Sequence, residues 1–126
     1  MVKKVFLYRG MEIAELQTLS LSELGDIFTA DVRRKIKRGF TEAEKKFLSD
    51  ITTGNNVKTH CRDMLILPLM VDKTVKVHVG NSFQDVIIQP AMVGHRLGEY
   101  ALSRKRVRHG SAGVGASRSG ANQARK

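Results

Sequence analysis

Two short groups of residues carry side chains that could do chemistry. In the first, Cys61 directly follows His60, and an imidazole within hydrogen-bonding distance of a thiol can activate it as a nucleophile. Adjacent residues of an extended segment point to opposite faces, so this imidazole cannot easily reach the thiol. The pair therefore does not predict catalysis, and we expect that the protein is not an enzyme.

The second group consists of His95 and Glu99, which are four residues apart and would share one face of a regular helix, as metal ligands do. Gly94 and Gly98 disfavour such a helix, and no further ligands cluster nearby. The single cysteine, Cys61, excludes a Cys-rich zinc site and a disulfide within the chain. We expect no metal site and no cofactor, and assign His95 to capping, packing or contact with a phosphate.

The glycine-rich segment 110–115 superficially resembles a phosphate-binding loop. It lacks a preceding strand, a following helix and the Gly-Lys-Ser/Thr ending of a mononucleotide site. Glycine and alanine also let a chain run close to RNA while neighbouring basic residues neutralise phosphates. Such residues surround the segment: Arg104, Lys105, Arg106, Arg108 and Arg118. We favour nucleic-acid contact over the alternative of a tail that only increases solubility.

The charge of the chain is concentrated in two places. Its 126 residues, enough for one domain, carry 22 Lys and Arg against 12 Asp and Glu, which gives a net charge of +10. Residues 31–58 have four more basic than acidic residues, and residues 103–126 have seven basic residues and no acid. This distribution favours nucleic acid as the partner over an anionic membrane surface. The balanced segment 59–102 is where we expect the hydrophobic core.

A strongly basic helix is predicted over residues 31–38. Val32 and Ile36 are spaced for one apolar face, and Gly39 is a natural C-terminal cap. The basic residues cover the remaining surface: Arg33, Arg34, Lys35, Lys37 and Arg38. Asn and Gln, which read base edges in DNA, are absent from this helix. Phosphate contact with a folded RNA is therefore preferred, and a free DNA-binding module built on the N-terminal helices is the alternative.

Capping signals and hydrophobic periodicity predict the elements around this helix. Ser20 with Glu23, and Thr41 with Glu44, each have the spacing of a capping box, and residues 52–56 have the composition of a linker. The apolar run 64–67 is consistent with a buried strand. Alternating valines at 75–79 and a return strand at 85–88 predict a hairpin. A short helix should begin at Pro90.

Several of these segments together resemble one protein family. Residues 59–68, the pair Met70-Val71, and Met-Val-Gly-His-Arg-Leu-Gly-Glu-Tyr at 92–100 closely resemble the core of the universal small-subunit ribosomal protein family nineteen. Segments 8–10, 33–34 and 38–39 look like its archaeal and eukaryotic branch, whose eukaryotic cytosolic member is traditionally numbered fifteen. In the tail, segments 109–110 and 113–116 match that branch.

The resemblance implies an α+β fold and a non-enzymatic role in translation. The fold would have short N-terminal helices, a small three-stranded mixed sheet with a short packed helix, and an extended C-terminal tail. The family is a structural constituent of the small-subunit head, bound to rRNA beside neighbouring head proteins, with its tail directed toward tRNA and the decoding region. It would act in the cytoplasm, with a nucleolar assembly stage in a eukaryote and no membrane partner.

The resemblance and the charge distribution together assign residues to three segments. These are an N-terminal helical extension over 1–57, an α+β core over 58–102 and a basic extended tail over 103–126. The tail's tRNA-proximal residues would be Arg118, Arg125 and Lys126. The predicted rRNA-binding residues are Arg33, Arg34, Lys35, Lys37, Arg38, Arg62, His95, Arg96, Arg104, Lys105, Arg106, Arg108 and His109.

This sequence departs from the family pattern at two places in the core. The family usually has glycine where Asp72 stands, and Tyr-Asn-Gly-Lys where residues 78–81 read His-Val-Gly-Asn. Because Val79 is unsuited to a positive φ, we expect Gly80 and Asn81 to form the hairpin turn.

Overall fold

The computed structural model describes residues 5–107, so the predicted contacts of Arg108, His109, Arg118, Arg125 and Lys126 lie outside the described residues. The helices are α1 (Ile13–Thr18), α2 (Leu21–Ile27), α3 (Ala30–Arg38) and α4 (Glu42–Thr53). A two-stranded sheet joins β1 (Leu7–Tyr8) to β2 (Met11–Glu12), and a three-stranded sheet contains β3 (Val57–Thr59), β4 (Thr74–His78) and β5 (Phe83–Ile87). Short 3-10 helices are η1 (Pro68–Met70), η2 (Pro90–Met92) and η3 (Leu97–Glu99).

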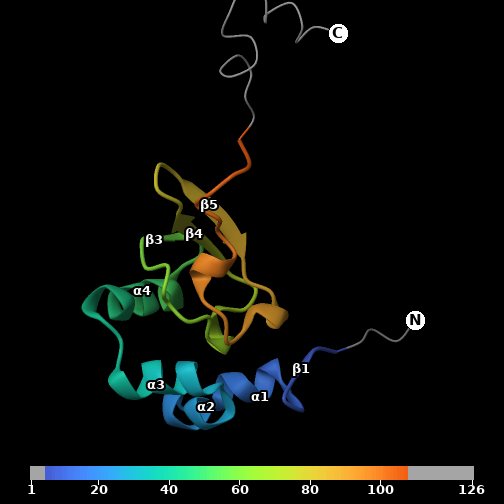
Figure 1. The fold of residues 1–126 in the computed structure, drawn as a ribbon. Coiled ribbons are helices and arrows are strands. Elements are labelled where there is room, and N and C mark those ends of the chain that lie inside the picture. The colour runs from blue at the N-terminus through green and yellow to red at the C-terminus, as the bar shows by residue number, and fades with distance from the viewer. Residues whose placement is uncertain (1–4, 108–126) are drawn as a thin grey trace, which may run out of the picture.

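This arrangement is the predicted α+β fold. The larger sheet is mixed, because β3 runs parallel and β5 antiparallel to the central β4. Figure 1 shows α1, α2 and α3 at one end of the molecule, the three-stranded sheet at the other, and α4 next to the sheet. The basic helix and the sheet therefore form separate surfaces.

The helices begin and end where the local signals predict. Ser20 caps α2 by accepting the backbone N–H of Glu23, whose carboxylate accepts the backbone N–H of Ser20 in return. Thr41 and Glu44 form the same reciprocal pair at the start of α4. Gly39 ends α3 with a φ of 86°, a conformation in which a side chain would be strained.

The predicted hairpin is confirmed. Val75 and Val77 are fully buried on the inner face of β4, as their alternation with polar residues requires. The backbone N–H of Val79 donates to the carbonyl of Ser82 at 2.9 Å, and Gly80 has a φ of 110°. Gly80 and Asn81 thus occupy the turn, as expected. Pro90 also begins a short 3-10 helix.

The third strand is not where we expected it. Residues 64–67 are buried, but they form no regular strand, because their backbone pairs with the irregular segment 94–97. Leu97 N–H donates to the carbonyl of Met64 at 3.0 Å, and Ile66 N–H donates to that of His95 at 2.8 Å. The strand is β3 instead, and α4 continues to Thr53, so the linker is shorter than predicted.

The core extends beyond residues 59–102, which corrects the expectation from charge. One cluster of buried apolar side chains joins the sheet and the segment 64–71 to residues of all four helices. The helices contribute Leu16, Leu24, Val32, Phe47 and Ile51, and Phe28, directly after α2, joins them. The short helices cannot stay ordered alone, so their apolar faces are buried against the rest of the chain.

Candidate nucleic-acid interface

The five basic residues of α3 divide into two groups that differ in their contacts. Arg33 belongs to the first group. Its guanidinium donates to the carbonyl of Gly25 at 2.9 Å, to that of Asp26 at 3.0 Å and, more weakly, to that of Phe28. These carbonyls lie at the end of α2, where the helix leaves its last acceptors without partners. Arg33 therefore caps α2 and fixes its position against α3.

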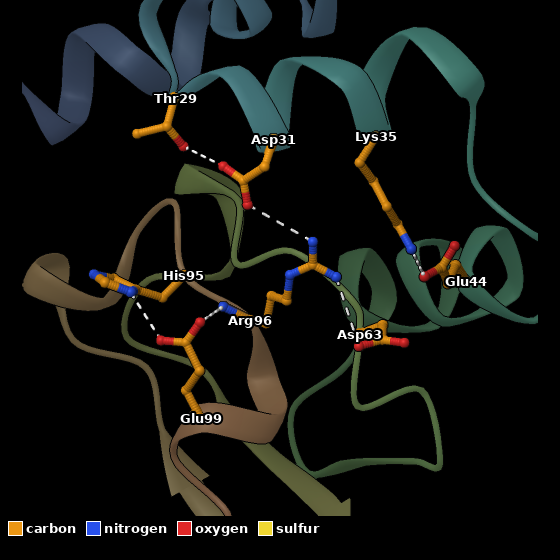
Figure 2. A network of polar contacts seen from close by, with 8 residues as sticks. All are labelled: Thr29, Asp31, Lys35, Glu44, Asp63, His95, Arg96 and Glu99. Carbon is orange, nitrogen blue, oxygen red and sulfur yellow. Dashed lines mark hydrogen bonds and ion pairs between the residues drawn. The ribbon is translucent and has the colours of Figure 1, made fainter.

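Lys35 also makes an internal contact. Its Nζ lies 2.6 Å from Oε1 of Glu44, whose side chain is only 4% exposed, so the pair joins α3 to α4 (Figure 2). Burial would by itself raise the pKa of Glu44. Hydrogen bonds from Lys35 and from the backbone of Thr41 outweigh burial, and the pKa lies below its ordinary value. Glu44 is therefore ionised at neutral pH, and it holds the Lys35 ammonium in place.

The second group on α3 faces solvent. Arg34, Lys37 and Arg38 are exposed. A cavity of about 350 Å³ lies beside Arg34 and Arg38, and it is lined by Asp31, Arg34, Lys35, Arg38, Gly39 and Arg96. We call this cavity the basic cavity, because four of its lining residues are basic and one is acidic. It brings three residues of the predicted basic helix together with Arg96, which lies far from them in the sequence.

Arg96 is held between two carboxylates (Figure 2). Its guanidinium nitrogens lie 3.7 Å from Asp31 of α3 and 3.6 Å from Asp63. The Thr29 hydroxyl donates to Asp31 at 2.7 Å and lowers the pKa of that carboxyl, which keeps it ionised. Both ion pairs are long and substantially exposed, so they cost little to replace. Arg96 is therefore positioned at the cavity and remains able to bind an anion.

His95 and Glu99 interact with each other rather than forming part of the basic cavity. His95 Nδ1 lies 2.9 Å from one carboxylate oxygen of Glu99, and the other oxygen accepts the backbone N–H of Arg96. Both side chains are about half exposed. Within residues 5–107, no three His, Cys, Asp or Glu side chains gather as a metal ion would require.

Arg62 was predicted to face RNA, and the structure places its guanidinium in internal contacts. It donates to the carbonyls of His78 at 2.8 Å, of Gly98 at 3.0 Å and of Ala101. A Cβ on Gly98 would lie 3.1 Å from the Cβ and the carbonyl oxygen of Arg62, so a side chain there would force Arg62 to shift by a few tenths of an ångström. Arg62 thus ties the end of β4 to the segment that precedes the tail.

The first basic residues of the tail are exposed. Arg104, Lys105 and Arg106 follow the buried Ala101, the last residue of the core. The Arg62 contact to Ala101 fixes the point from which they leave the domain.

No helix of the described part of the chain is long and apolar enough to cross a membrane.

Comparison with known proteins now gives the family. The model of the family described as ribosomal protein S19 matches residues 34–109, which is more than half of the chain. A small ribosomal subunit protein uS19 from Methanoculleus marisnigri is 49% identical over 93% of this chain and 86% of its own length. One from Nitrosopumilus maritimus is 46% identical over 92% of this chain and 93% of its own length. The chain belongs to the ribosomal protein S19 family.

The family assignment confirms the resemblance read from the sequence. The matched region includes the run at 92–100 and most of the basic helix. Both organisms are archaea, which agrees with the archaeal and eukaryotic branch indicated by segments 8–10 and 33–34. Asp72, where the family usually has glycine, has a φ of 65°, so this S19 chain keeps the backbone conformation that glycine would favour.

Sequence reasoning missed one group of side chains in this S19 family member. His60 does not pair with Cys61. Its ring stacks on that of His78, with centroids 4.4 Å apart, and Phe83 lies edge-on to both rings. The signal that could have found this group is the register of β3 beside β4, because Thr59 pairs with Val77 and the next residues are therefore neighbours.

Proposed function

We propose that this chain is a structural constituent of the small ribosomal subunit and binds the rRNA of the subunit head through the basic cavity. The observation that carries this proposal is the cavity itself, in which Arg34 and Arg38 of one helix meet Arg96, while Lys35 in its wall is paired with Glu44. Basic residues that a fold gathers from distant segments form a local anion site, which a solvated charged face does not. The match to small ribosomal subunit proteins supports RNA as the anion.

The mechanism is recognition of phosphate positions and RNA shape, without chemistry on a substrate. Each guanidinium offers a planar fork of donors that matches two phosphate oxygens. Arg34 and Arg38 are exposed and Arg96 is partly exposed, so phosphates can reach all three. Neutralised phosphates release counterions, which makes such binding strongly dependent on salt. The internally bonded Arg33, Lys35 and Arg62 instead hold the segments that present this surface.

The tail extends the same surface in our proposal. Arg104, Lys105 and Arg106 begin it, Arg108 and His109 continue it along rRNA, and its last basic residues reach toward tRNA and the decoding region. Deleting residues 103–126 should leave the domain folded, because the core ends at Ala101. It should lower the salt slope of RNA binding by roughly 0.7 to 0.9 per lost phosphate contact. An unchanged slope would show that the tail contacts no rRNA phosphate.

The proposed partners are small-subunit rRNA and the neighbouring proteins of the head, in the cytoplasm. Centrifugation of a cell lysate through a sucrose gradient tests this directly, because a tagged copy of the full chain should sediment with small subunits. Recovery only in the soluble fractions at the top of the gradient would overturn the proposal. In a eukaryotic cell, assembly would begin in the nucleolus, which imaging of the same tagged chain would test.

A second measurement separates RNA from DNA as the polyanion. The full chain should bind a transcript of the small-subunit head more tightly than a DNA duplex of equal length at the same salt concentration. The reason is that the basic cavity is a discrete site for phosphates brought close by a folded RNA, whereas α3 offers no Asn or Gln to read a DNA groove. Equal or tighter binding to DNA would favour a free DNA-binding module.

A further inference from the structure

The three-stranded sheet carries a group of rings on its solvent-facing side. Val75 and Val77 point into the core, so alternation places Lys76 and His78 on the opposite face of β4. His78 pairs with Phe83 of β5 in the register of the hairpin. His60 directly follows β3, which runs parallel beside β4. The backbone thus brings His60, His78 and Phe83 together, and we call these three residues the aromatic platform.

The rings of the aromatic platform pack against one another without being buried. The imidazoles of His60 and His78 are stacked, with centroids 4.4 Å apart and planes inclined by 32°. Phe83 lies edge-on to both, with its ring centroid 5.2 Å from that of His60 and 5.0 Å from that of His78. His60 is exposed, and Phe83 keeps 36% of its surface in solvent. The exposed parts of His60 and Phe83 are therefore available to another molecule.

Positive charge accompanies these rings. The Lys58 ammonium lies 5.5 Å from the centroid of Phe83, a cation–π contact that keeps the charge beside the platform. Lys76 follows on the same face, and Asp85, its partner at 3.8 Å, is the acidic residue of β5. Rings next to lysines on an open sheet are the arrangement with which proteins bind unpaired nucleotides, because every base has a face that can stack.

We propose that an unpaired nucleotide of an RNA stacks on the aromatic platform, with Lys58 neutralising its phosphate. This inference rests on the proposed RNA binding, but it concerns the three-stranded sheet, which lies at the other end of the molecule from α3 (Figure 1). His78 adds a polar contact. Its Nδ1 accepts the backbone N–H of Gly80 at 3.3 Å, so the neutral ring carries its proton on Nε2 and can donate it to a base or a ribose.

Two other uses of these histidines do not fit the geometry. A protein metal site is usually built from three or more ligands, and the described residues supply no third ligand beside the two tilted imidazoles. General-base catalysis would need His60 to approach the Cys61 thiol, but its ring is packed on His78. Stacking with a further ring is the interaction that this arrangement leaves open.

Fluorescence offers a direct test, because the chain contains no tryptophan. Phe83→Trp places a single fluorophore in the aromatic platform. Leu69→Trp is the matched control, because Leu69 is 37% exposed and lies on η1, which packs on α1 and is not part of the three-stranded sheet. A 12-nucleotide oligo(A) RNA should quench the tryptophan of Phe83→Trp and not that of Leu69→Trp. An A·U duplex of the same length should quench neither, because its bases are paired. Equal quenching of both variants, or none, would overturn the proposal.

Binding affinity gives the second readout. Phe83→Leu keeps apolar bulk and removes the ring, and it should weaken binding of oligo(A) roughly five- to a hundredfold. Ile87→Ala is the matched control, since Ile87 lies on the same strand and face and is 64% exposed, and it should bind normally. If both variants bind oligo(A) like the unchanged protein, the platform proposal fails while RNA binding stands. If the unchanged protein binds neither oligo(A) nor a head rRNA transcript, the proposed function fails as well.

Discussion

Arg33 and Arg34 are adjacent in the sequence and have opposite roles in the structure. Arg33 turns inward and donates to the carbonyls that end α2, whereas Arg34 is exposed beside the basic cavity. Lys35 and Arg62 resemble Arg33, because each is bound to groups of the chain itself. The comparison teaches that the role of a basic residue, whether it links segments of the fold or faces a partner, depends on where its donors point. Net charge alone cannot distinguish the two roles.

The inner basic residues link segments, and the outer ones form a surface. Arg33 links α2 to α3, Lys35 links α3 to α4, and Arg62 links the end of β4 to the segment at 98–101. Substitution of an inner residue should therefore change stability. Substitution of an outer residue should change RNA binding and leave stability nearly unaltered.

The largest effect should come from Arg62→Ala. It removes a charged group that satisfies three partly buried carbonyls, and each lost hydrogen bond to a charged group costs about 1.5–3 kcal/mol. We expect the free energy of unfolding, measured by urea denaturation, to fall by roughly 3–5 kcal/mol. Arg104→Ala, at an exposed position, is the control and should have no measurable effect. A loss below about 1 kcal/mol for Arg62→Ala would place Arg62 among the outer residues.

Arg33 and Arg34, adjacent in the sequence, give the most closely matched test of the difference between inner and outer basic residues. Arg33→Ala leaves the carbonyls at the end of α2 without their donor, and should lower the free energy of unfolding by about 2 kcal/mol. Arg34→Ala should change it by less than about 0.5 kcal/mol, because an exposed side chain without such bonds contributes little. Equal losses of stability in the two variants would remove the distinction between inner and outer residues.

A smaller, pH-dependent effect should follow Glu44→Gln. The pKa of Glu44 lies below its ordinary value of 4.5, so the carboxylate stabilises the folded protein at neutral pH. This contribution is lost as the pH falls from about 4.5 through the lower pKa of the folded state. The variant should lose about 1–2 kcal/mol at pH 7, and its stability should fall less steeply in acid.

Glu42→Gln is the control for that pH dependence. Glu42 lies on the same helix and pairs with Lys45, but its side chain is 91% exposed, so the pair contributes little. Its stability curve against pH should follow that of the unchanged protein. If Glu42→Gln reduced the loss of stability in acid as much as Glu44→Gln does, the buried Lys35–Glu44 pair would not be the source of the pH dependence.

Local signals made much of the fold predictable. The capping boxes at Ser20 and Thr41 and the glycine at Gly39 act within a few residues of their own positions, so they could be read directly from the sequence. The strand β3 could not be predicted from the sequence, because its three residues show little periodicity and pair with β4, which lies far along the chain. Residues 64–67 are apolar because they are buried, and burial does not require a strand.

The candidate site was predictable in composition and not in geometry. The sequence identified the basic residues of α3 as a set. That Arg33 and Lys35 point inward depends on where the end of α2 and the carboxylate of Glu44 lie in the fold. That Arg96 joins Arg34 and Arg38 depends in the same way on how the segment at 95–99 packs against α3. The aromatic platform was missed because its rings come from β4, from β5 and from the residue that follows β3.

The central claim is that the outer residues bind phosphate while the inner residues hold the fold. The salt dependence of binding to a transcript of the small-subunit head tests it most directly. Removing two phosphate contacts with Arg34→Ala and Arg38→Ala together should lower the slope of log K against log salt by roughly 1.4 to 1.8. Lys45→Ala with Lys46→Ala removes equal charge from α4, outside the basic cavity, and should leave the slope unchanged. A folded Arg34/Arg38 variant with the slope of the unchanged protein would contradict the account.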